Sequence, residues 1–267
     1  MILAIDMGNT NIVIGCVDDR QTYFIERLST DKGKTDLEFA MIFKNVLELY
    51  NIDVTQIEGG IISSVVPPLN NVLISAVEKI IGRKPYLVSS GLKTGINIRM
   101  DNPKTVGSDM IVDAVAGINV YGAPLIIIDM GTATTMSVVD EKGCYIGGMI
   151  APGVRLSMDS LANNTAQLFK VSLEAPEHAI GKNTIDCIQS GLMLGTACMI
   201  DGMIDRMEAE LGYKTTVLAT GGLAKVIVPL CHHEIILDND LLLKGLKIIY
   251  DKNEGSARSR RERYAEK

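Results

Sequence analysis

The chain has 267 residues, of which 47% are hydrophobic, and this is enough for two packed cores of ordinary domain size. Its formal net charge of −6 excludes the broad basic surface that a nucleic-acid-binding protein needs, so no nucleic-acid partner is expected. The five cysteines form no C-x-x-C pair, which favours reduced thiols. No basic leader or 18-residue apolar run is evident, so we expect a cytoplasmic protein without a membrane partner.

The first predicted element is a short apolar strand within residues 2–11 (ILAIDMGNTN), which ends in Asp6 and a glycine turn. A carboxylate at a strand end can stay ionised and hold a cation. Gly8 lets the backbone N–H groups of the turn approach an anion, and neutral hydrogen-bonding side chains follow at Asn9, Thr10 and Asn11. The stretch therefore predicts a phosphate-binding turn, although a single copy of such a pattern is also common in ordinary turns.

The rest of the first half alternates strands and helices. Strands are predicted at residues 12–17, 23–28, 60–66 and 86–88, and helices at 36–51, capped by Asp36, and at 69–81. A three-strand meander joined to parallel strands through crossover helices is the plan of a ribonuclease-H-like half. A loop is expected at 89–103, and a helix at 106–121 carries Gly107, Ser108 and Asp109 in its first turn. At that position Asp109 is as readily a helix-capping carboxylate as a functional one.

The second half repeats the plan. Residues 126–135 (IIIDMGTATT) place Asp129 where Asp6 stands, 129 − 6 = 123 residues later, and this repetition indicates a duplicated phosphate-binding unit. A meander (136–140, 145–150), a helical stretch from 153, a polar loop at 178–184 and a long helix at 185–211 follow. A strand at 217–219 then leads into the turn Gly221-Gly222, and residues 255–267 are expected to be a disordered tail.

These blocks together resemble the type III pantothenate kinases, within the actin-like ATPase superfamily that includes hexokinase. The resemblance covers residues 1 to about 250. It is carried by these blocks: DMGNTN, RLSTD (27–31), ISSVVP (62–67), TGINI (94–98), DNPKTVGSD (101–109), DMGTATT, GGMIAPG (147–153), IGKNT (180–184) with QSG (189–191), and ATGG (219–222).

The resemblance implies an α/β fold of two duplicated ribonuclease-H-like domains, at 1–118 and 119–254, with an ATP cleft between them, in a homodimer. It implies ATP-dependent phosphorylation of pantothenate, the first step of coenzyme A biosynthesis, with Asp109 as general base. Asp6 would meet Mg²⁺ through ATP, and Asp129 would hold a monovalent cation, K⁺ or NH₄⁺. The implied ATP-binding residues are Asp6, Met7, Gly8, Asn9, Thr10, Asn11, Ile12, Val13, Thr132, Gly221 and Gly222. The implied pantothenate-binding residues are Met100, Gly107, Ser108, Asp109, Met110 and Thr184.

Two positions depart from the family pattern. Where the family commonly has Tyr and Arg around the pantothenate pocket, this chain has Met100 and Met110. Two alternatives therefore stay open: a kinase for another small alcohol, and a regulatory protein that keeps the nucleotide fold without turnover. The presence of Asp6, Asp109 and Asp129 argues against the second alternative.

Overall fold

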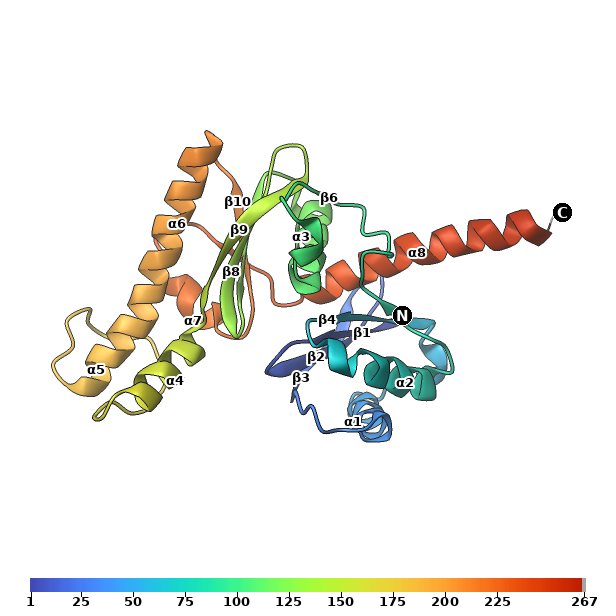
Figure 1. Ribbon diagram of the computed structural model, residues 1–267, viewed down its shortest axis with the longest axis horizontal. Coiled ribbons are helices and arrows are strands. Elements are labelled where there is room, and N and C mark those ends of the chain that lie inside the picture. The colour runs from blue at the N-terminus through green and yellow to red at the C-terminus, as the bar shows by residue number, and fades with distance from the viewer. Residues whose placement is uncertain (266–267) are drawn as a thin grey trace. The chain divides into compact units, whose positions relative to one another are not determined.

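A computed structural model describes residues 1–265, which form two compact units, each with its own sheet (Figure 1). Unit 1 comprises Met1–Ile96, Asp101–Asn119 and the chain from Asp240 onward. Unit 2 comprises Asn97–Met100 and Val120–Asn239. The two units are described separately below.

Unit 1 contains a five-stranded sheet in the order β3-β2-β1-β4-β5, in which β2 is antiparallel to both β1 and β3, and β4 is parallel to both β1 and β5. Its elements are β1 (Ile2–Met7), β2 (Asn11–Val17), β3 (Thr22–Ser29), α1 (Asp36–Leu49), β4 (Gly59–Ser64), α2 (Asn70–Ile81), β5 (Tyr86–Leu87), α3 (Ser108–Tyr121), whose last two residues fall in unit 2, and α8 (Leu241–Ala265). The predicted meander and crossover helices are confirmed.

The N-cap of helix α1 lies one residue before the predicted one. The hydroxyl of Thr35 accepts a hydrogen bond from Glu38 N, and the Glu38 carboxylate accepts one from Thr35 N, so Thr35 and not Asp36 is the N-cap. Asp36 instead binds Lys79 and Ser75 of α2. This pairing requires the tertiary packing of α1 on α2, which a local pattern does not show.

Strand β1 is buried on both faces, and this explains its uninterrupted apolar sequence. One face, with Leu3, Ile5 and Met7, belongs to the core that α1 and α2 complete. The other face, with Ile2 and Ala4, packs in a second cluster that includes residues of α8. Figure 1 shows α1 and α2 on one side of this sheet and α8 on the other.

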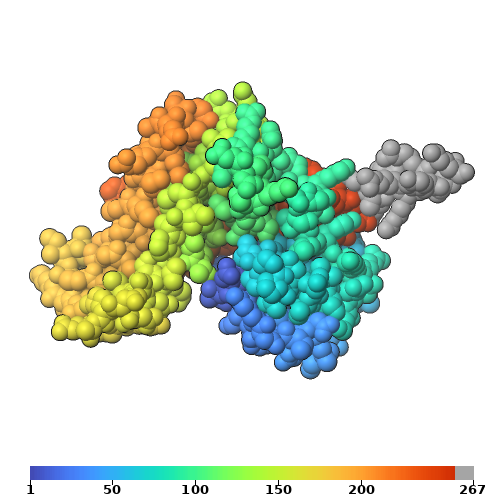
Figure 2. All heavy atoms as spheres, viewed as in Figure 1, coloured from blue at the N-terminus to red at the C-terminus, as the bar shows by residue number. Residues whose placement is uncertain are grey.

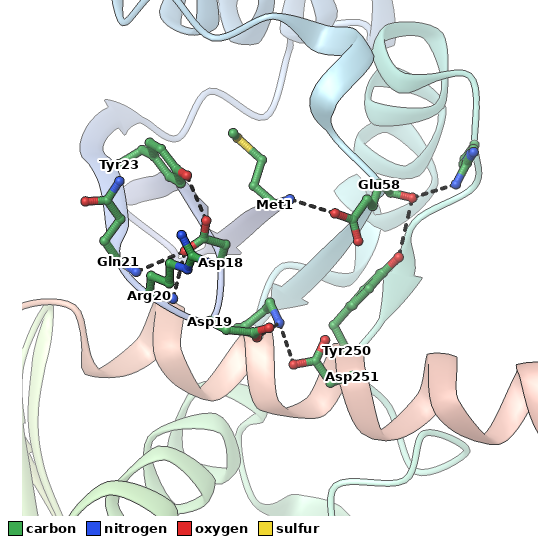
Figure 3. A network of polar contacts seen from close by, with 11 residues as sticks. Met1, Asp18, Asp19, Arg20, Gln21, Tyr23, Glu58, Tyr250 and Asp251 are labelled. Carbon is green, nitrogen blue, oxygen red and sulfur yellow. Dashed lines mark hydrogen bonds and ion pairs between the residues drawn. The ribbon is translucent and has the colours of Figure 1, made fainter.

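The assignment of residues 240–254 to the second domain is wrong at the level of packing, because α8 belongs to unit 1. Leu243, Leu246 and Ile249 are buried against that sheet, and each such side chain stabilises the fold by about 1.5–3 kcal/mol. Tyr250 Oη donates to Glu58 O at 3.5 Å, and Lys247 pairs with Asp19 of the turn before β3 and with Asp251 (Figure 3).

The expected disordered tail is also wrong for most of its length. Helix α8 runs to Ala265, and residues 266–267 lie outside the described part of the chain. Residues 256–265 contain four Arg and two Ala, and neither Gly nor Pro, and such a composition favours helix.

Unit 2 repeats the sheet of unit 1. Read from the meander, five of its six strands lie in the order β9-β8-β7-β10-β11, with β7 parallel to β10 and β10 parallel to β11. The elements are β7 (Leu125–Met130), β8 (Ala133–Val139), β9 (Cys144–Pro152), α4 (Val154–Asn164), α5 (Thr184–Gln189), α6 (Gly195–Leu211), β10 (Thr216–Thr220), α7 (Ala224–Ile227) and β11 (Ile236–Leu237). Two strands were not predicted: β11, which pairs with β10, and β6 (Asn97–Ile98), which lies within the expected loop and pairs with β9. The duplication predicted from the two Asp-Met-Gly turns is confirmed.

The long helix predicted at 185–211 is interrupted. A π-helical segment, Ser190–Leu194, separates α5 from α6. Contrary to the expectation of no apolar run, Thr184–Leu211 is long and apolar enough to cross a membrane by length and composition, and 33% of its most apolar window is buried within the chain. A single such helix is weak evidence for a membrane span, since helices that pack inside proteins have the same composition.

Candidate active site

The first predicted phosphate turn lies at the carboxyl end of β1. Asp6 is 9% exposed and pairs in register with Ser63 of the parallel strand β4. Gly8 N donates to Asn11 O at 2.9 Å, and a Cβ on Gly8 would lie 2.9 Å from the same oxygen, so the turn requires glycine. Asn9 and Thr10 of this turn are exposed.

Two of the predicted ATP-binding residues around the first turn have side chains that belong to the hydrophobic core. The side chains of Met7 and Ile12 are fully buried in the core of unit 1, and Val13 is half-buried. Because these side chains face the core, any contact of Met7 or Ile12 with a nucleotide would be through the backbone.

Asp109 is half-buried in the first turn of α3. Burial raises the pKa of its carboxyl group above the ordinary value, against a lowering effect of the hydrogen bond from Met110 N to Oδ1 at 2.9 Å. A Cβ on Gly107 would lie 2.3 Å from Asp109 Oδ1, so the side chain of Asp109 folds over a position that only glycine leaves free. A helix-capping acid normally has a lowered pKa, and a raised one is more typical of a functional site.

Ser108 is occupied by contacts with the protein. Its hydroxyl lies 3.0 Å from Ser63 Oγ, accepts a hydrogen bond from Ser64 N at 3.2 Å and donates to Ser64 O at 3.2 Å. These contacts hold the start of α3 at the end of β4, beside Asp6, and so bring Asp109 to the same sheet edge. The sequence analysis gave Ser63 no role; the signal was that two serines end an apolar strand level with Asp6.

The second turn lies at the carboxyl end of β7 in unit 2. Asp129 pairs in register with Thr220 of β10, and the turn at Gly221 follows directly. A Cβ on Gly221 would lie 2.5 Å from Asp129 Oδ1 and 2.6 Å from Met130 N. Gly221 has a φ of +99° and leaves the room in which the carboxylate lies. The structure thus brings Asp129 together with Gly221, while Thr132 and Gly222 are exposed beside them.

The remaining predicted residues are divided between the units. Met110 follows Asp109 in unit 1, whereas Met100 is in unit 2, with its sulfur 3.7 Å from the position of a Cβ on Gly147. Thr184 is the exposed first residue of α5, which Asn183 caps by accepting a hydrogen bond from Asp186 N.

The donors for a metal ion are sparse. Within residues 1–265, no group of three or more His, Cys, Asp or Glu side chains is placed to hold a metal. The carboxylates of Asp6, in β1, and Asp129, in β7, are of the kind that binds hard cations, which also take oxygen ligands from a phosphate or from water.

The two sheets of the same plan give the chain an actin-like ATPase fold. Two solved structures share this fold. The activator of the 2-hydroxyisocaproyl-CoA dehydratase from Clostridium difficile, with bound ADPNP, has a TM-score of 0.57 at 13% identity and covers 97% of each chain. Component A of the (R)-2-hydroxyglutaryl-CoA dehydratase from Acidaminococcus fermentans has a TM-score of 0.55 at 14% identity, over 93% of this chain and 96% of that one.

Sequence comparison identifies the family. The model of the type III pantothenate kinase family matches residues 2–206. The type III pantothenate kinases of Moorella thermoacetica and of an Exiguobacterium species are 43% and 45% identical to this chain, over 95% of its length and 100% of theirs. The chain belongs to the type III pantothenate kinase family.

Proposed function

We propose that this protein transfers the γ-phosphoryl group of ATP to the primary hydroxyl of pantothenate, giving 4'-phosphopantothenate at the first step of coenzyme A biosynthesis. Membership of the family supports this most directly. The position of Asp109 agrees with it, because its neighbour Ser108 is hydrogen-bonded to Ser63, which pairs in register with Asp6. We place the reaction in the cytoplasm, without a nucleic-acid or membrane partner, in keeping with the acidic net charge.

In this proposal Asp109 accepts the proton of the pantothenate hydroxyl. The alcohol oxygen bonds to the γ-phosphorus, the bond from that phosphorus to the β–γ bridging oxygen breaks, and ADP leaves. The turn at 8–11 and the residues Thr132, Gly221 and Gly222 bind ATP. Mg²⁺, held by the phosphates near Asp6, would neutralise their charge.

The test is a phosphotransfer assay with ATP, Mg²⁺ and K⁺ across a panel of small alcohols that includes pantothenate. We expect pantothenate to be phosphorylated with the highest kcat/KM. ATP consumption with another alcohol and none with pantothenate would favour the alternative kinase, and nucleotide binding without any turnover would favour the regulatory alternative.

We further propose that Asp129 holds a monovalent cation, K⁺ or NH₄⁺, that the reaction needs besides Mg²⁺. A carboxylate in a glycine-lined space is a hard-oxygen site. Replacing K⁺ by Na⁺ or Tris at constant ionic strength and constant Mg²⁺ should remove most of the activity of the wild type, and Asp129→Asn should be insensitive to the exchange. Equal wild-type rates in K⁺ and in Tris would contradict the assignment of Asp129.

We also propose a homodimer whose interface includes α5 and α6. Several large apolar side chains of unit 2 are exposed on or near α4 and α5, among them Ile150, Leu156, Phe169, Ile180 and Ile185, and Figure 2 shows this part of unit 2 at the surface. A Cβ on Gly191, Gly195 or Gly202 would meet nothing within 4 Å, so packing within the chain does not require these glycines. A partner helix packed closely against α6 would require them.

The dimer is tested by light scattering at micromolar concentration. Wild type should have twice the chain mass of 28.9 kDa, and Gly195→Leu should shift the protein towards the monomer without loss of helix. Asn45→Leu, which adds the same side chain to the exposed face of α1, should remain dimeric. A monomeric wild type would rule out the proposed interface.

A further inference from the structure

Thr30 follows β3 and is in contact with the first phosphate turn. Its Oγ1 donates to Gly8 O at 2.7 Å and lies 3.7 Å from Met7 Sδ, while its backbone N donates to Thr10 O at 2.9 Å. One residue thus binds the turn at two carbonyl groups, one through its side chain and one through its backbone.

The duplication provides an internal comparison. In unit 2 the position of Thr30 is taken by Gly153, whose N donates to Thr132 O at 3.0 Å, as Thr30 N does to Thr10 O. The backbone contact is therefore present in both copies. The side-chain contact is present only in unit 1, because a Cβ on Gly153 would lie 2.4 Å from Thr132 O and 2.6 Å from Gly131 O.

The difference follows from the length of the two turns. Met7 pairs with Ile12, which leaves residues 8–11 in the first turn, whereas Met130 pairs with Thr134, which leaves only residues 131–133 in the second. The shorter turn lies directly on the backbone of Gly153. The longer turn leaves room for a side chain. The side chain of Thr30 fills that room, and its hydroxyl donates a hydrogen bond to the turn at Gly8 O.

We propose that Thr30 is a positioning residue for the triphosphate of ATP, an inference that rests on the proposed role of the first turn. In a trans peptide the C=O and the following N–H point in opposite directions. The hydroxyl of Thr30 holds the Gly8 carbonyl towards β3, and so directs the N–H of Asn9 to the other side of the turn, where it can donate to a phosphate oxygen. Without the hydroxyl this peptide is free to rotate, and the donor is no longer pre-oriented.

The test compares Thr30→Val, which keeps the shape without the hydroxyl, with Thr30→Ser, which keeps the hydroxyl. Loss of one oriented hydrogen bond should raise the Kd of a non-hydrolysable ATP analogue and the KM for ATP about five- to tenfold in Thr30→Val. The KM for the alcohol acceptor should not change, and Thr30→Ser should bind the analogue like the wild type.

Thr22→Val is the matched control. Thr22 lies at the other end of the same strand, is half-buried like Thr30, and donates to Asp240 Oδ2 at 2.7 Å. Thr22→Val should lower the stability of the protein without weakening its binding of the nucleotide. The inference would be overturned if Thr30→Val bound the analogue as tightly as the wild type does. It would also be overturned if Thr22→Val lost as much affinity for the analogue, or if Thr30→Ser did not keep the wild-type affinity. By contrast, a wild type that binds the analogue but does not phosphorylate pantothenate would overturn only the proposed function.

Discussion

Asp109→Asn is expected to lower kcat by about 10²- to 10⁴-fold while ATP affinity stays nearly unchanged. The amide keeps the shape of the carboxylate but cannot accept the proton of the acceptor hydroxyl. Nucleotide binding should be preserved because the turn at 8–11 does not depend on this side chain. Steady-state rates with saturating substrates and calorimetry with an ATP analogue measure the two quantities.

The raised pKa of Asp109 adds a pH signature. A general base acts in its ionised form, so wild-type activity should fall as the pH drops through this raised pKa, at a higher pH than for an ordinary aspartate. The same shift means that the ionised carboxylate costs folding stability above that pH. Asp109→Asn should therefore lose the acidic limb of the rate profile and should melt at the same temperature as the wild type or higher.

Asp36→Asn is the control for a purely structural role of an acid in the first turn of a helix. Asp36 is also an acid in the first turn of a helix, but Lys79 and Ser75 lower the pKa of its carboxyl group to about 2. It therefore contributes stability that is present above the unfolded pKa and is lost as the pH falls. Its amide variant should melt lower and keep normal kcat. If Asp109→Asn behaved in the same way and kept more than about half of wild-type kcat, Asp109 would be only a cap.

Met110→Arg is expected to lower the KM for pantothenate about 10- to 100-fold, with kcat little changed. The resemblance to the family implies an Arg here, and a charge-assisted hydrogen bond to the pantothenate carboxylate is worth roughly 1.5–3 kcal/mol. Arg99, another cation near Met100 in the chain, has its Nη1 3.9 Å from Asp140 Oδ2 within unit 2. The wild type should therefore phosphorylate pantothenate with a high KM.

The test of the acceptor site uses two substrates and one control variant. Pantothenate is compared with a neutral N-alkyl pantothenamide, and Met41→Arg provides the same substitution at a 59% exposed position on α1. Met41→Arg should leave KM unchanged. A neutral analogue used at least tenfold better than pantothenate, or no reaction with millimolar pantothenate, would show that the acceptor site is suited to a different alcohol.

Several features were readable from the sequence because they depend on neighbouring residues. The apolar run that ends in Asp6 and its repeat at Asp129 predicted two sheets of the same plan, and their strand order confirms this. Apolar periodicity also located α1, α2 and α3, with each predicted end no more than two residues from the observed one. The N-cap of α1 was misplaced because two adjacent residues, Thr35 and Asp36, can both cap a helix.

The sequence alone determined the duplication, the family and the acidic residues at the ends of β1 and β7, since each is a local pattern or an ordered set of such patterns. Only the tertiary structure decided that α8 covers the sheet of unit 1, that Ser63 and Ser108 hold the start of α3, and that Thr30 rather than a glycine binds the first turn. These features depend on contacts such as Ser63 with Ser108, 45 residues apart, and Lys247 with Asp19, 228 apart. Spacing along the chain says nothing about such contacts, because sheet register and helix packing bring the residues together only when the chain folds.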